Sequence, residues 1–591
     1  MDIQGKLNFE VLISVILIIL YTIASPIFNK FNFHYIHESG LVMLLGILIT
    51  LLLKNLNFTS NFSTSLAFDD KIFFTFILPP IIFGAGYNLK RRNFFKYFLY
   101  IFLFGVIATI ITFIWVAINT YLFNKLHFFY LSYSQYDNQS LNEIDGIQKQ
   151  NNSILLDFSI MDSLSFAAVI SATDPVAALT FIDEEAEPKL FSILFGEGSV
   201  NDAVCPVIFK ILTDFQKSGG NFKMSTILSM IGTFCSLFGC SIIIGIGTGI
   251  IGCLILKYLK KYCIGRYYEC ALIYIFGYLS YIISQEYNLS PIIALLFNGI
   301  FNAHYTFYNL SFQAREESAT LSKVLSAIAE AFVFIYLGLT AVHYFQIAFS
   351  WNFMLFELIL IIIGRFVAIY GICFIMDFFH ISSFKLSFVE RGICCCSGTI
   401  RGAIAFGLSI SIMSKSKINK DILLSTTLAQ VFFSTIVFGG LIPYIIKFWK
   451  SFEKIEEIDH NKSINEDKNS NNLSIIGTGK QFYYEHPNFV NIIEDYSKEK
   501  NIKILKRRLS YYIGKYWLEF DNDYIKPKLI CNWPEIKKEQ NEITEVIINE
   551  VKKFINEKNE KFKLLDDKNE NKNNDDNYIE NKLEEKLIVS S

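Results

Sequence analysis

The chain has 591 residues, of which 52% are hydrophobic and only 18% are charged, and its mean hydropathy is +0.36. Soluble domains usually carry about a quarter of their residues as charge, so this composition excludes a wholly soluble protein and a wholly disordered one. The net charge of −2 argues against nucleic acid as the main partner.

Long apolar stretches follow one another from the beginning of the sequence to about Trp449. A bilayer-spanning helix needs roughly 17–25 apolar residues, and helix is expected because an open sheet cannot satisfy its backbone groups in lipid. We therefore predict an all-α polytopic membrane domain over residues 1–449, with about thirteen transmembrane helices. They lie near residues 9–28, 36–54, 72–90, 97–125, 156–182, 191–215, 226–257, 268–286, 289–305, 319–346, 352–378, 388–413 and 421–449. The first stretch has no basic leader and no small-residue cleavage site, so we interpret it as a retained span, with a signal anchor as the alternative.

Basic residues in short loops predict the orientation of these spans. The loops Lys90–Lys96 and Lys257–Arg266 are strongly basic and fall on the same side if the spans alternate, so we place that side in the cytosol. The tail that begins at Lys450 is then cytosolic as well. The loop from Lys415 to Lys420 breaks the rule, because its lysines would face outside.

Residues 450–591 differ from the membrane domain, and we predict that they form a cytosolic regulatory tail. Residues 558–591 are a low-complexity run of Asn, Lys and Glu, which is typical of disorder. In residues 487–534, aromatic and aliphatic side chains recur at near-helical spacing. This pattern predicts a small ordered helical module that packs against the membrane domain.

The fifth stretch contains the motif Thr173-Asp174-Pro175 at membrane depth. Proline removes an amide donor and clashes with the preceding turn, and Asp-Pro is also an ordinary helix beginning, with Asp as the cap. We expect the span to break at Thr173–Asp174 and to restart at Pro175. A break in lipid is tolerated only around a cavity or an ion, because it exposes backbone carbonyl and amide groups. A simple proline kink with a capping Asp is the alternative.

The sixth stretch places Glu197 and Asp202 in an otherwise apolar helix, with Asn201 one turn beyond Glu197 on nearly the same face. Asp202 points about 100° further round the helix. A buried carboxylate without a partner holds a proton readily, and the same oxygen atoms suit a hard cation once the proton has left. One such group, open to either side in turn, is sufficient for exchange. The alternative is a structural ion pair that buries both acids.

Three further charged side chains lie at membrane depth, where ionisable residues are costly and functional by default. Arg365, deep in the eleventh stretch, is expected to pair with an acid, and Glu330 in the tenth is a candidate accessory acid. Arg401 lies in the segment Ser397–Ala403, where two glycines and a threonine weaken the helix and suggest a second break. Glycine used for close packing of membrane helices is the alternative. Two interrupted segments in separate parts of one membrane domain point to a transporter site near the midplane.

At these positions the chain resembles the eukaryotic sodium/proton exchangers of the monovalent cation/proton antiporter superfamily. The likeness covers about residues 36–449 and rests on segments that occur in family order: Leu78–Phe83, Ser171–Val176, Phe195–Val204 and Arg401–Phe406. Further similarity, to the organellar or endosomal branch, is found in His37–Gly40, Ala85–Arg92, Ala303–Ser311 and the tail segment Trp517–Pro527.

The resemblance implies a role for each matching residue in an antiporter fold with two interrupted, crossing helices. Asp202 would carry Na⁺ or K⁺ and H⁺ by turns, with Asn201 beside it. Thr173 would lend oxygen ligands to the ion, and Asp174 would offset the positive helix ends. Relatives with Asn-Asp at these positions exchange one cation per proton, so electroneutral exchange is implied.

The remaining implied roles are structural. Glu197 and Arg365 would form a supporting ion pair, while Arg401 and Pro175 would stabilise the broken helices. The chain departs from many relatives at Gly198, where a serine often follows the glutamate. This departure removes a side-chain oxygen near the ion and leaves the choice between Na⁺ and K⁺ open.

From these residues we predict a secondary active antiporter, not an enzyme, that serves pH and monovalent cation homeostasis. The expected partners are Na⁺ or K⁺, H⁺, membrane lipid, a second copy of the chain in a homodimer, and regulatory proteins that bind the tail. No cofactor is expected, and the cysteines show neither CxxC pairs nor zinc-ligand spacing. The expected location is an endosomal or other organellar membrane, or the plasma membrane.

Two other classes of membrane protein share some of these features. A cation channel needs a continuous pore lined by carbonyl or acidic rings, and no repeated filter-like segment is visible. An intramembrane aspartyl protease needs two membrane-embedded aspartates, for which Asp174 and Asp202 qualify by number. Neither aspartate has the Tyr-Asp or Gly-x-Gly-Asp surroundings usual in such enzymes.

Overall fold

A computed structural model describes part of the chain, and the structural statements below concern that part. The described residues are 15–23, 38–55, 73–89, 91–132, 149–150, 153–174, 176–180, 182, 187–219, 224–262, 265–379, 385–414, 416–449, 517 and 520–538. They fall into two units, one of residues 1–467 with 507–531 and the other of residues 468–506 with 532–591. In the second unit only residues 532–538 are described.

The described part is mainly helical, which confirms the predicted fold class. Up to residue 262 the elements after a helical segment at residues 15–23 are α2 (Glu38–Asn55), η1 (Phe73–Ile77), α5 (Leu78–Tyr87), α6 (Arg91–Phe102), η2 (Leu103–Ala108), α7 (Thr109–Lys125), α8 (Ile160–Ile170), α9 (Val176–Leu179), α10 (Pro188–Lys217), α11 (Met224–Leu259) and η5 (Lys260–Tyr262). The later elements are α12 (Arg266–Glu286), α13 (Pro291–Phe301), η6 (Asn302–Thr306), α14 (Phe307–Asn309), α15 (Phe312–Ile347), α16 (Trp351–Phe378), α17 (Phe388–Ser397), α18 (Ala403–Ile410), α19 (Lys417–Phe433), η7 (Ser434–Phe438), η8 (Asp521–Ile525) and α24 (Lys526–Leu529).

Five described helices are long and apolar enough to cross a membrane. They are Phe94–Lys125, Ser225–Leu259, Phe312–Val342, Trp351–Phe378 and Lys417–Trp449. The π-helical segments η2 and η7 lie within two of them and do not interrupt them. Shorter apolar helices, such as Ile160–Ile170, account for further stretches. The number of about thirteen spans stays a prediction.

A small antiparallel sheet between α7 and α8 was not predicted. Its strands are β1 (Tyr130–Ser132), β2 (Lys149–Gln150) and β3 (Ser153–Leu155), in the order β1-β3-β2. Tyr130 pairs with Leu155, and Lys149 pairs with Ile154. The strands are only two or three residues long, too short for an alternating pattern to identify them in the sequence.

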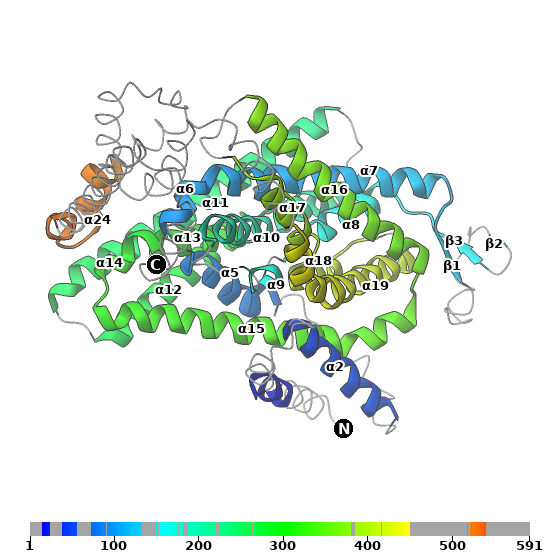
Figure 1. Ribbon diagram of the computed structural model, residues 1–591, viewed down its shortest axis with the longest axis horizontal. Coiled ribbons are helices and arrows are strands. Elements are labelled where there is room, and N and C mark those ends of the chain that lie inside the picture. Colours follow the sequence, from blue (N-terminus) through cyan, green and yellow to red (C-terminus); the bar gives the residue numbers. More distant parts are fainter. Residues whose placement is uncertain are drawn as a thin grey trace, which may run out of the picture. The chain divides into compact units, whose positions relative to one another are not determined.

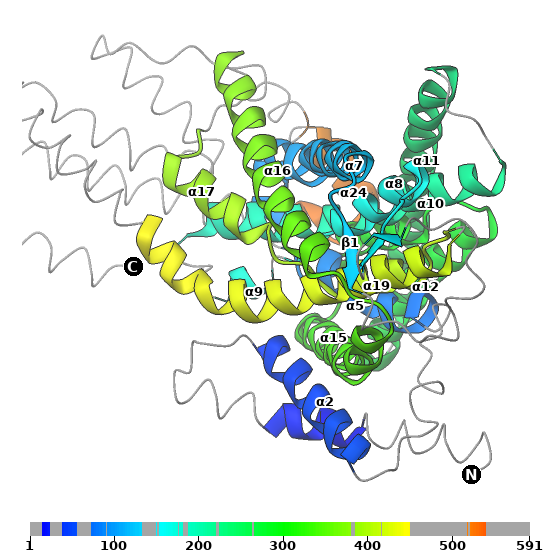
Figure 2. The same cartoon turned by 90° about the vertical axis from the view of Figure 1, so that its right-hand side faces the viewer.

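Close helix packing brings the elements of the membrane domain together. In Figures 1 and 2, α2 lies along the outer side of α15. The two helices meet where a Cβ atom added to Gly46 would lie 2.9 Å from the Cα atom of Gly338. Small residues at such crossings allow backbones to approach closely, which is how helices associate in lipid.

The two helices that lead into the candidate site begin in the same way. Ser159 caps α8 by accepting from the amide of Asp162, whose carboxylate accepts from the amide of Ser159. Ser387 and Glu390 form the equivalent capping box at the beginning of α17. Each box satisfies two backbone amides that a helix beginning leaves without partners, so it fixes where the helix begins.

Two predictions about the tail fall mostly outside the described residues. The predicted ordered module at residues 487–534 is described at residue 517 and from residue 520 on, and there it is helical in part. The segment predicted to be disordered, residues 558–591, is not among the described residues. The boundary between residues 449 and 450 stays a prediction.

Candidate functional site

The first interruption contains the predicted break at Thr173–Asp174, although the helix before it ends three residues earlier than that break. Helix α8 stops at Ile170, and residues 171–174 are not helical before α9 begins at Val176. The freed amides find partners on other elements. The amide of Thr173 donates to Oδ1 of Asn201 at 2.8 Å, and that of Asp174 donates to the carbonyl oxygen of Ile400 at 2.9 Å. Pro175 itself lies outside the described residues.

The second interruption separates α17 from α18 over residues 398–402. Because Ile400 belongs to it, the Asp174–Ile400 hydrogen bond joins the two interruptions directly. The amide of Arg401 donates to Oγ of Ser434 at 3.0 Å, which attaches the break to η7. Figure 1 shows α9, α10 and α18 grouped near this crossing.

Asn201 fastens the first interruption to α10. Its side chain is fully buried and donates to Oγ1 of Thr109 at 2.6 Å and to the carbonyl oxygen of Ser171 at 3.2 Å. Its Oδ1 atom accepts from the amide of Thr173. The amide group of Asn201 is thus occupied with structural hydrogen bonds.

Asp202, the next residue on α10, has very different surroundings. It is partly exposed, and its carboxylate makes no hydrogen bond within the described part of the chain. The negative charges of Asp174 and Glu330 both act on it, and that of Asp174 also acts on Glu330. The fold therefore brings acids from three separate elements into mutual electrostatic range, which attracts cations.

These acids do not form a ready-made chelate. Among the residues that the structure describes, no three His, Cys, Asp or Glu side chains lie close enough to hold a metal ion together. Glu330 reaches Oγ of Ser326 on its own helix at 3.5 Å. An ion at Asp202 would be held by this carboxylate together with water or backbone oxygens, which suits a transported cation more than a resident one.

Asp174 lies against the beginning of α18. A Cβ atom added to Gly402, the residue that precedes this helix, would lie 2.7 Å from Cβ and 2.8 Å from Oδ2 of Asp174. A helix N-terminus carries a partial positive charge, so a carboxylate at this place is stabilised. Thr173 is buried beside Asp174, with its amide bound to Asn201.

Glu197 and Arg365 form a buried ion pair between α10 and α16. The guanidinium group also occupies the space that a side chain on Gly398 would need, at the end of α17. The carbonyl end of a helix carries a partial negative charge, so Arg365 faces two sources of negative potential. The pair thereby links α10 to the second interruption.

Arg401 serves both interruptions. Its side chain is buried, and its Nη1 atom donates to the carbonyl oxygen of Ala172, just beyond the end of α8. Its backbone belongs to the break between α17 and α18. The sequence suggested only the second role.

Comparison with known proteins identifies the family. The sequence model described as "Sodium/hydrogen exchanger, transmembrane" matches residues 14–448. The chain belongs to this exchanger family.

Curated relatives agree with this assignment. The exchanger is 28% identical over 486 residues to sodium/hydrogen exchanger 4 of Arabidopsis thaliana, covering 78% of this chain and 84% of that protein. It is 29% identical over 474 residues to human sodium/hydrogen exchanger 9, covering 80% of this chain and 65% of that protein. In fold it resembles the sodium proton antiporter MjNhaP1 from Methanocaldococcus jannaschii at pH 8, with a TM-score of 0.52, 16% identity, and coverage of 75% of this chain and 98% of the other.

The exchanger is therefore an integral multi-pass membrane transporter for Na⁺ and H⁺, and not an enzyme. The prediction of sodium/proton antiport from the sequence is confirmed.

Several residues of the exchanger were missed by sequence reasoning. Thr109 holds Asn201 in place through its hydroxyl, but hydroxyl side chains are common in membrane helices and gave no signal. Ser171 binds Asn201 through its backbone carbonyl oxygen, which no side-chain pattern reveals. Glu357 on α16 is fully buried, and its Oε1 atom lies 2.7 Å from Oγ1 of Thr120. The sequence could have identified Glu357, because it is an acidic residue within a long apolar stretch.

Proposed function

We propose that Asp202 carries Na⁺ or K⁺ and H⁺ alternately, one cation for each proton. The observation that supports this most is the contrast between neighbours on α10. Asn201 is buried and fully engaged, whereas Asp202 is partly exposed and without a hydrogen bond in the described part of the chain. A carboxylate with an open side can bind either a proton or a cation, but not both at once.

The surrounding charges support competition between the two cargoes. The negative charges of Asp174 and Glu330 act on Asp202, so an ionised Asp202 without a bound cation is unfavourable and attracts a positive ion. Asn201 is uncharged, so a single carboxylate changes its occupancy in each cycle. This supports electroneutral exchange.

We propose that the binding site discriminates little between Na⁺ and K⁺. Gly198 lies one turn before Asp202 and offers no side-chain oxygen. A site with few protein ligands leaves more of the hydration shell on the ion and discriminates less by size. We therefore expect K⁺ to be accepted as well as Na⁺.

The cellular setting is proposed from the sequence and its likeness to the endosomal branch. The exchanger would work as a homodimer in an endosomal or other organellar membrane, or in the plasma membrane, with its C-terminus in the cytosol. It would serve pH and cation homeostasis without a cofactor. Lipid and tail-binding regulatory proteins would be its further partners.

The decisive variant is Asp202→Asn, which keeps the size of the side chain and removes its charge. In proteoliposomes that contain a pH-sensitive dye, an imposed Na⁺ or K⁺ gradient should drive proton flux with wild-type protein and none with Asp202→Asn. Asp214→Asn, an exposed aspartate on the same helix, is the matched control and should exchange normally.

Two outcomes would contradict the proposal. If folded Asp202→Asn protein still exchanges cations for protons, the transported ion must bind at another residue. Cation uptake by the wild-type protein without opposing proton movement would indicate a channel.

A further inference from the structure

Glu357 is a buried acid on α16 that the proposed transport cycle does not use. Its side chain is fully buried, and its Oε1 atom lies 2.7 Å from Oγ1 of Thr120 on α7. Its Oε2 atom is also buried and has no hydrogen-bond partner among the described residues. As a carboxylate ion, Glu357 would therefore have at most one hydrogen bond within the part of the chain that the structure describes.

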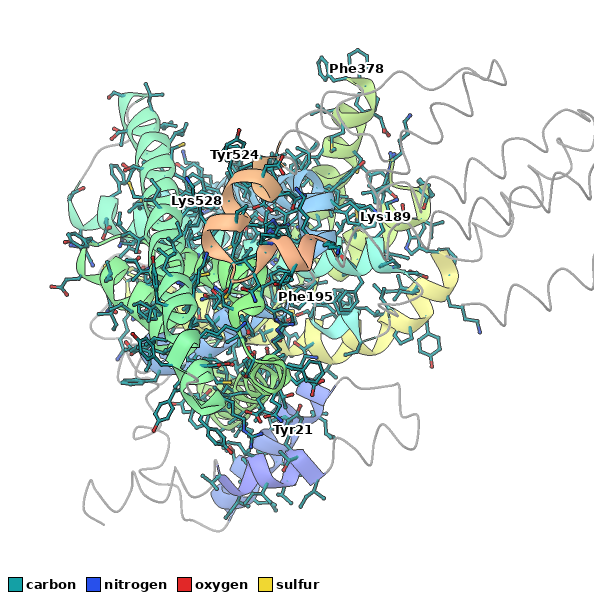
Figure 3. All side chains as sticks on the ribbon, turned by 90° about the vertical axis from the view of Figure 1, so that its left-hand side faces the viewer. Tyr21, Lys189, Phe195, Phe378, Tyr524 and Lys528 are labelled. Carbon is teal, nitrogen blue, oxygen red and sulfur yellow. The ribbon has the colours of Figure 1, made fainter. Side chains whose placement is uncertain are left out.

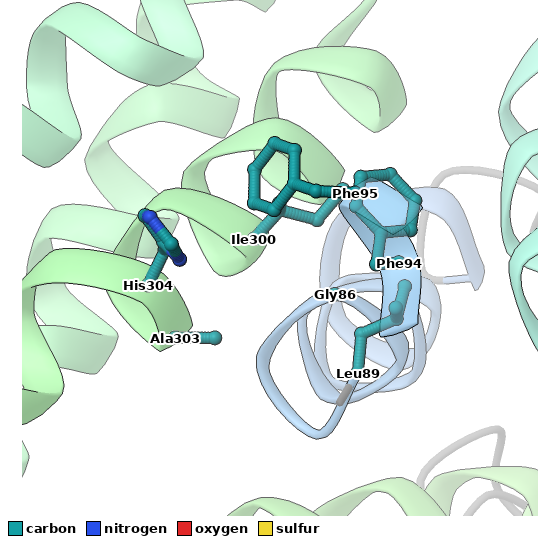
Figure 4. A pocket seen from close by; sticks show the side chains of 7 residues that line it. All are labelled: Gly86, Leu89, Phe94, Phe95, Ile300, Ala303 and His304. Carbon is teal, nitrogen blue, oxygen red and sulfur yellow. The ribbon is translucent and has the colours of Figure 1, made fainter. Parts of the chain in front are cut away.

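Acids elsewhere in the described part show what usually lies beside a carboxylate ion. Glu390 lies 2.7 Å from Nζ of Lys189, which is labelled in Figure 3. Asp521 lies 3.2 Å from Nζ of Lys526 and 3.3 Å from Nε2 of His304, whose ring lines the small cavity in Figure 4. Such neighbours offset the free energy that it costs to take a carboxylate out of water.

Glu357 has no neighbour of this kind among the described residues, where the hydroxyl of Thr120 is the one polar group that acts on it. Arg365, two turns further along α16, is paired with Glu197. The helices packed on α16 carry six other charged side chains, none of which acts on Glu357: Lys125 of α7, Glu390 and Arg391 of α17, and Lys417, Lys420 and Asp421 of α19. An isolated carboxylate ion is so unfavourable in an apolar interior that the group takes up a proton instead.

The hydrogen bonds of α7 indicate where this proton lies. Oγ1 of Thr120 is 2.8 Å from the carbonyl oxygen of Val116 and 2.7 Å from Oε1 of Glu357, but a hydroxyl has a single proton to donate. Thr109, on the same helix, donates to the carbonyl oxygen one turn earlier and accepts from the side-chain amide of Asn201. If Thr120 follows the same pattern, Glu357 is the donor, and a carboxyl group can donate only when it is protonated.

Apolar side chains lie on both sides of this carboxyl group along α16. Phe353, one turn before Glu357, is fully buried, and its ring lies 4.9 Å from that of Phe129, centroid to centroid. Ile361, one turn after Glu357, is buried as well. Asp202, in contrast, is partly exposed. The structure thus distinguishes an open carboxyl group, which suits exchange, from an enclosed one, which suits retention of a proton.

The contact between Glu357 and Thr120 also joins two helices that support the candidate site. Helix α7 carries Thr109, and α16 carries Arg365. A hydrogen bond between a neutral carboxyl group and a hydroxyl fixes the relative position of the two helices without burying a net charge between them.

We propose that Glu357 holds a second proton, which stays bound and is not transported. The proton lies on the carboxyl group of Glu357, which donates it to Oγ1 of Thr120, while the hydroxyl proton of Thr120 is donated to Val116. Glu357 is thus a positioning residue, and its proton adds nothing to the number of protons exchanged. The proposal goes beyond the role of Asp202 and does not depend on it.

Infrared spectroscopy of the full-length protein tests this proposal. At pH about 7 an exposed glutamate is ionised, because its ordinary pKa is about 4.3. The wild-type protein should nevertheless show the carbonyl-stretch band of a protonated carboxylic acid that is lost in Glu357→Gln. Saturating Na⁺ should leave this band in place, because the proton is not exchanged for a cation. Glu286→Gln, at an exposed position of α12, is the matched control and should remove no such band.

The yield of folded protein tests the positioning role. Glu357→Ala should lower the yield, because it removes the hydrogen bond and leaves a cavity. Glu357→Gln should restore it, because glutamine is uncharged, has nearly the size of glutamate and donates from its amide group. Thr120→Val removes the acceptor while keeping the shape of the side chain, so it should shift the infrared band of Glu357.

The contrary outcomes are distinct. If folded Glu357→Gln has the same infrared spectrum as the wild-type protein in this region, Glu357 is ionised and the proposal is wrong. A band that Na⁺ removes would make the proton a transported one, which also overturns the proposal. If Glu357→Gln yields too little protein, Thr120→Val decides, since an unshifted spectrum excludes the hydrogen bond. Absence of exchange by the wild-type protein would instead overturn the proposed function and leave the infrared result standing.

Discussion

Asn201 and Asp202 are neighbours in sequence, yet their side chains do different work. The amide of Asn201 both donates and accepts, so it can join Thr109, Ser171 and Thr173 in one set of hydrogen bonds. An ionised carboxylate could only accept, and it would leave the hydroxyl and the carbonyl oxygen without a donor. An asparagine at residue 201 therefore stabilises the interruption through these hydrogen bonds. The carboxylate of Asp202 remains available for the transported ion.

At the same scale, Arg365→Ala should lower the amount of folded exchanger. The substitution leaves Glu197 charged and buried without its partner, and breaking a buried ion pair typically costs about 3–5 kcal/mol. The measurement is the yield of monodisperse protein and its thermal unfolding in detergent, and Glu197→Gln should behave in the same way.

A double variant separates structure from transport. Because Glu197→Gln with Arg365→Met removes both charges together, it should recover much of the lost yield. Normal yield of Arg365→Ala with no transport would contradict the structural role and would indicate that the pair takes part in transport directly.

At the scale of elements, three half-helix ends at the crossing each face a side chain of opposite charge. Asp174 lies at the positive beginning of α18, Arg365 at the negative end of α17, and Arg401 binds the carbonyl oxygen of Ala172 beyond α8. Interrupted helices leave these partial charges without partners in a medium of low dielectric constant. The three side chains together explain how the breaks are tolerated.

Gly402→Ala tests the contact between Asp174 and α18. Gly402 has φ −112°, which any residue can adopt, so the requirement for glycine is one of space. The added methyl group would push Asp174 away from the helix beginning, and such overpacking typically costs about 1–3 kcal/mol. We expect exchange to fall about tenfold, as measured by dye-monitored proton flux, with most of the protein still folded.

Gly371→Ala on α16 is the matched control, because a Cβ atom there meets nothing within 4 Å. It should leave both exchange and yield unchanged. If the exchange rate of Gly402→Ala equals that of the wild-type protein, the position of Asp174 at this helix end is unimportant for transport.

The sequence predicted local features of this site better than distant ones. The break near Asp174 follows from the chemistry of Asp-Pro, which acts within one turn of helix. The hydrogen bond from Asp174 to Ile400 joins residues far apart in the chain, and no local pattern specifies it. The partial exposure of Asp202 likewise depends on the arrangement of several helices. Glu357 was missed although its signal was local.

At the scale of the whole chain, charge decides how the tail responds to pH. Burial alone would raise the pKa of Asp521, but hydrogen bonds from His304 and Tyr305 and the charge of Lys526 outweigh it and hold the pKa below its usual value. A lowered pKa in the packed state means that the contact of Asp521 with η6 favours the ionised form. This contribution is fully present above the ordinary aspartate pKa of about 4 and is lost as the pH falls through the lowered value.

Mild acidification should therefore not release the tail. His304 and Tyr305 face Asp521 from η6, and Lys526 faces it from α24. Hydrogen-exchange protection of residues 520–531, corrected for the intrinsic rate at each pH, should stay constant from pH about 7.5 to about 5 and fall only below about 4. In Asp521→Asn the acid-induced loss should disappear, whereas loss of protection in the wild-type protein near pH 6 would show that another group governs this contact.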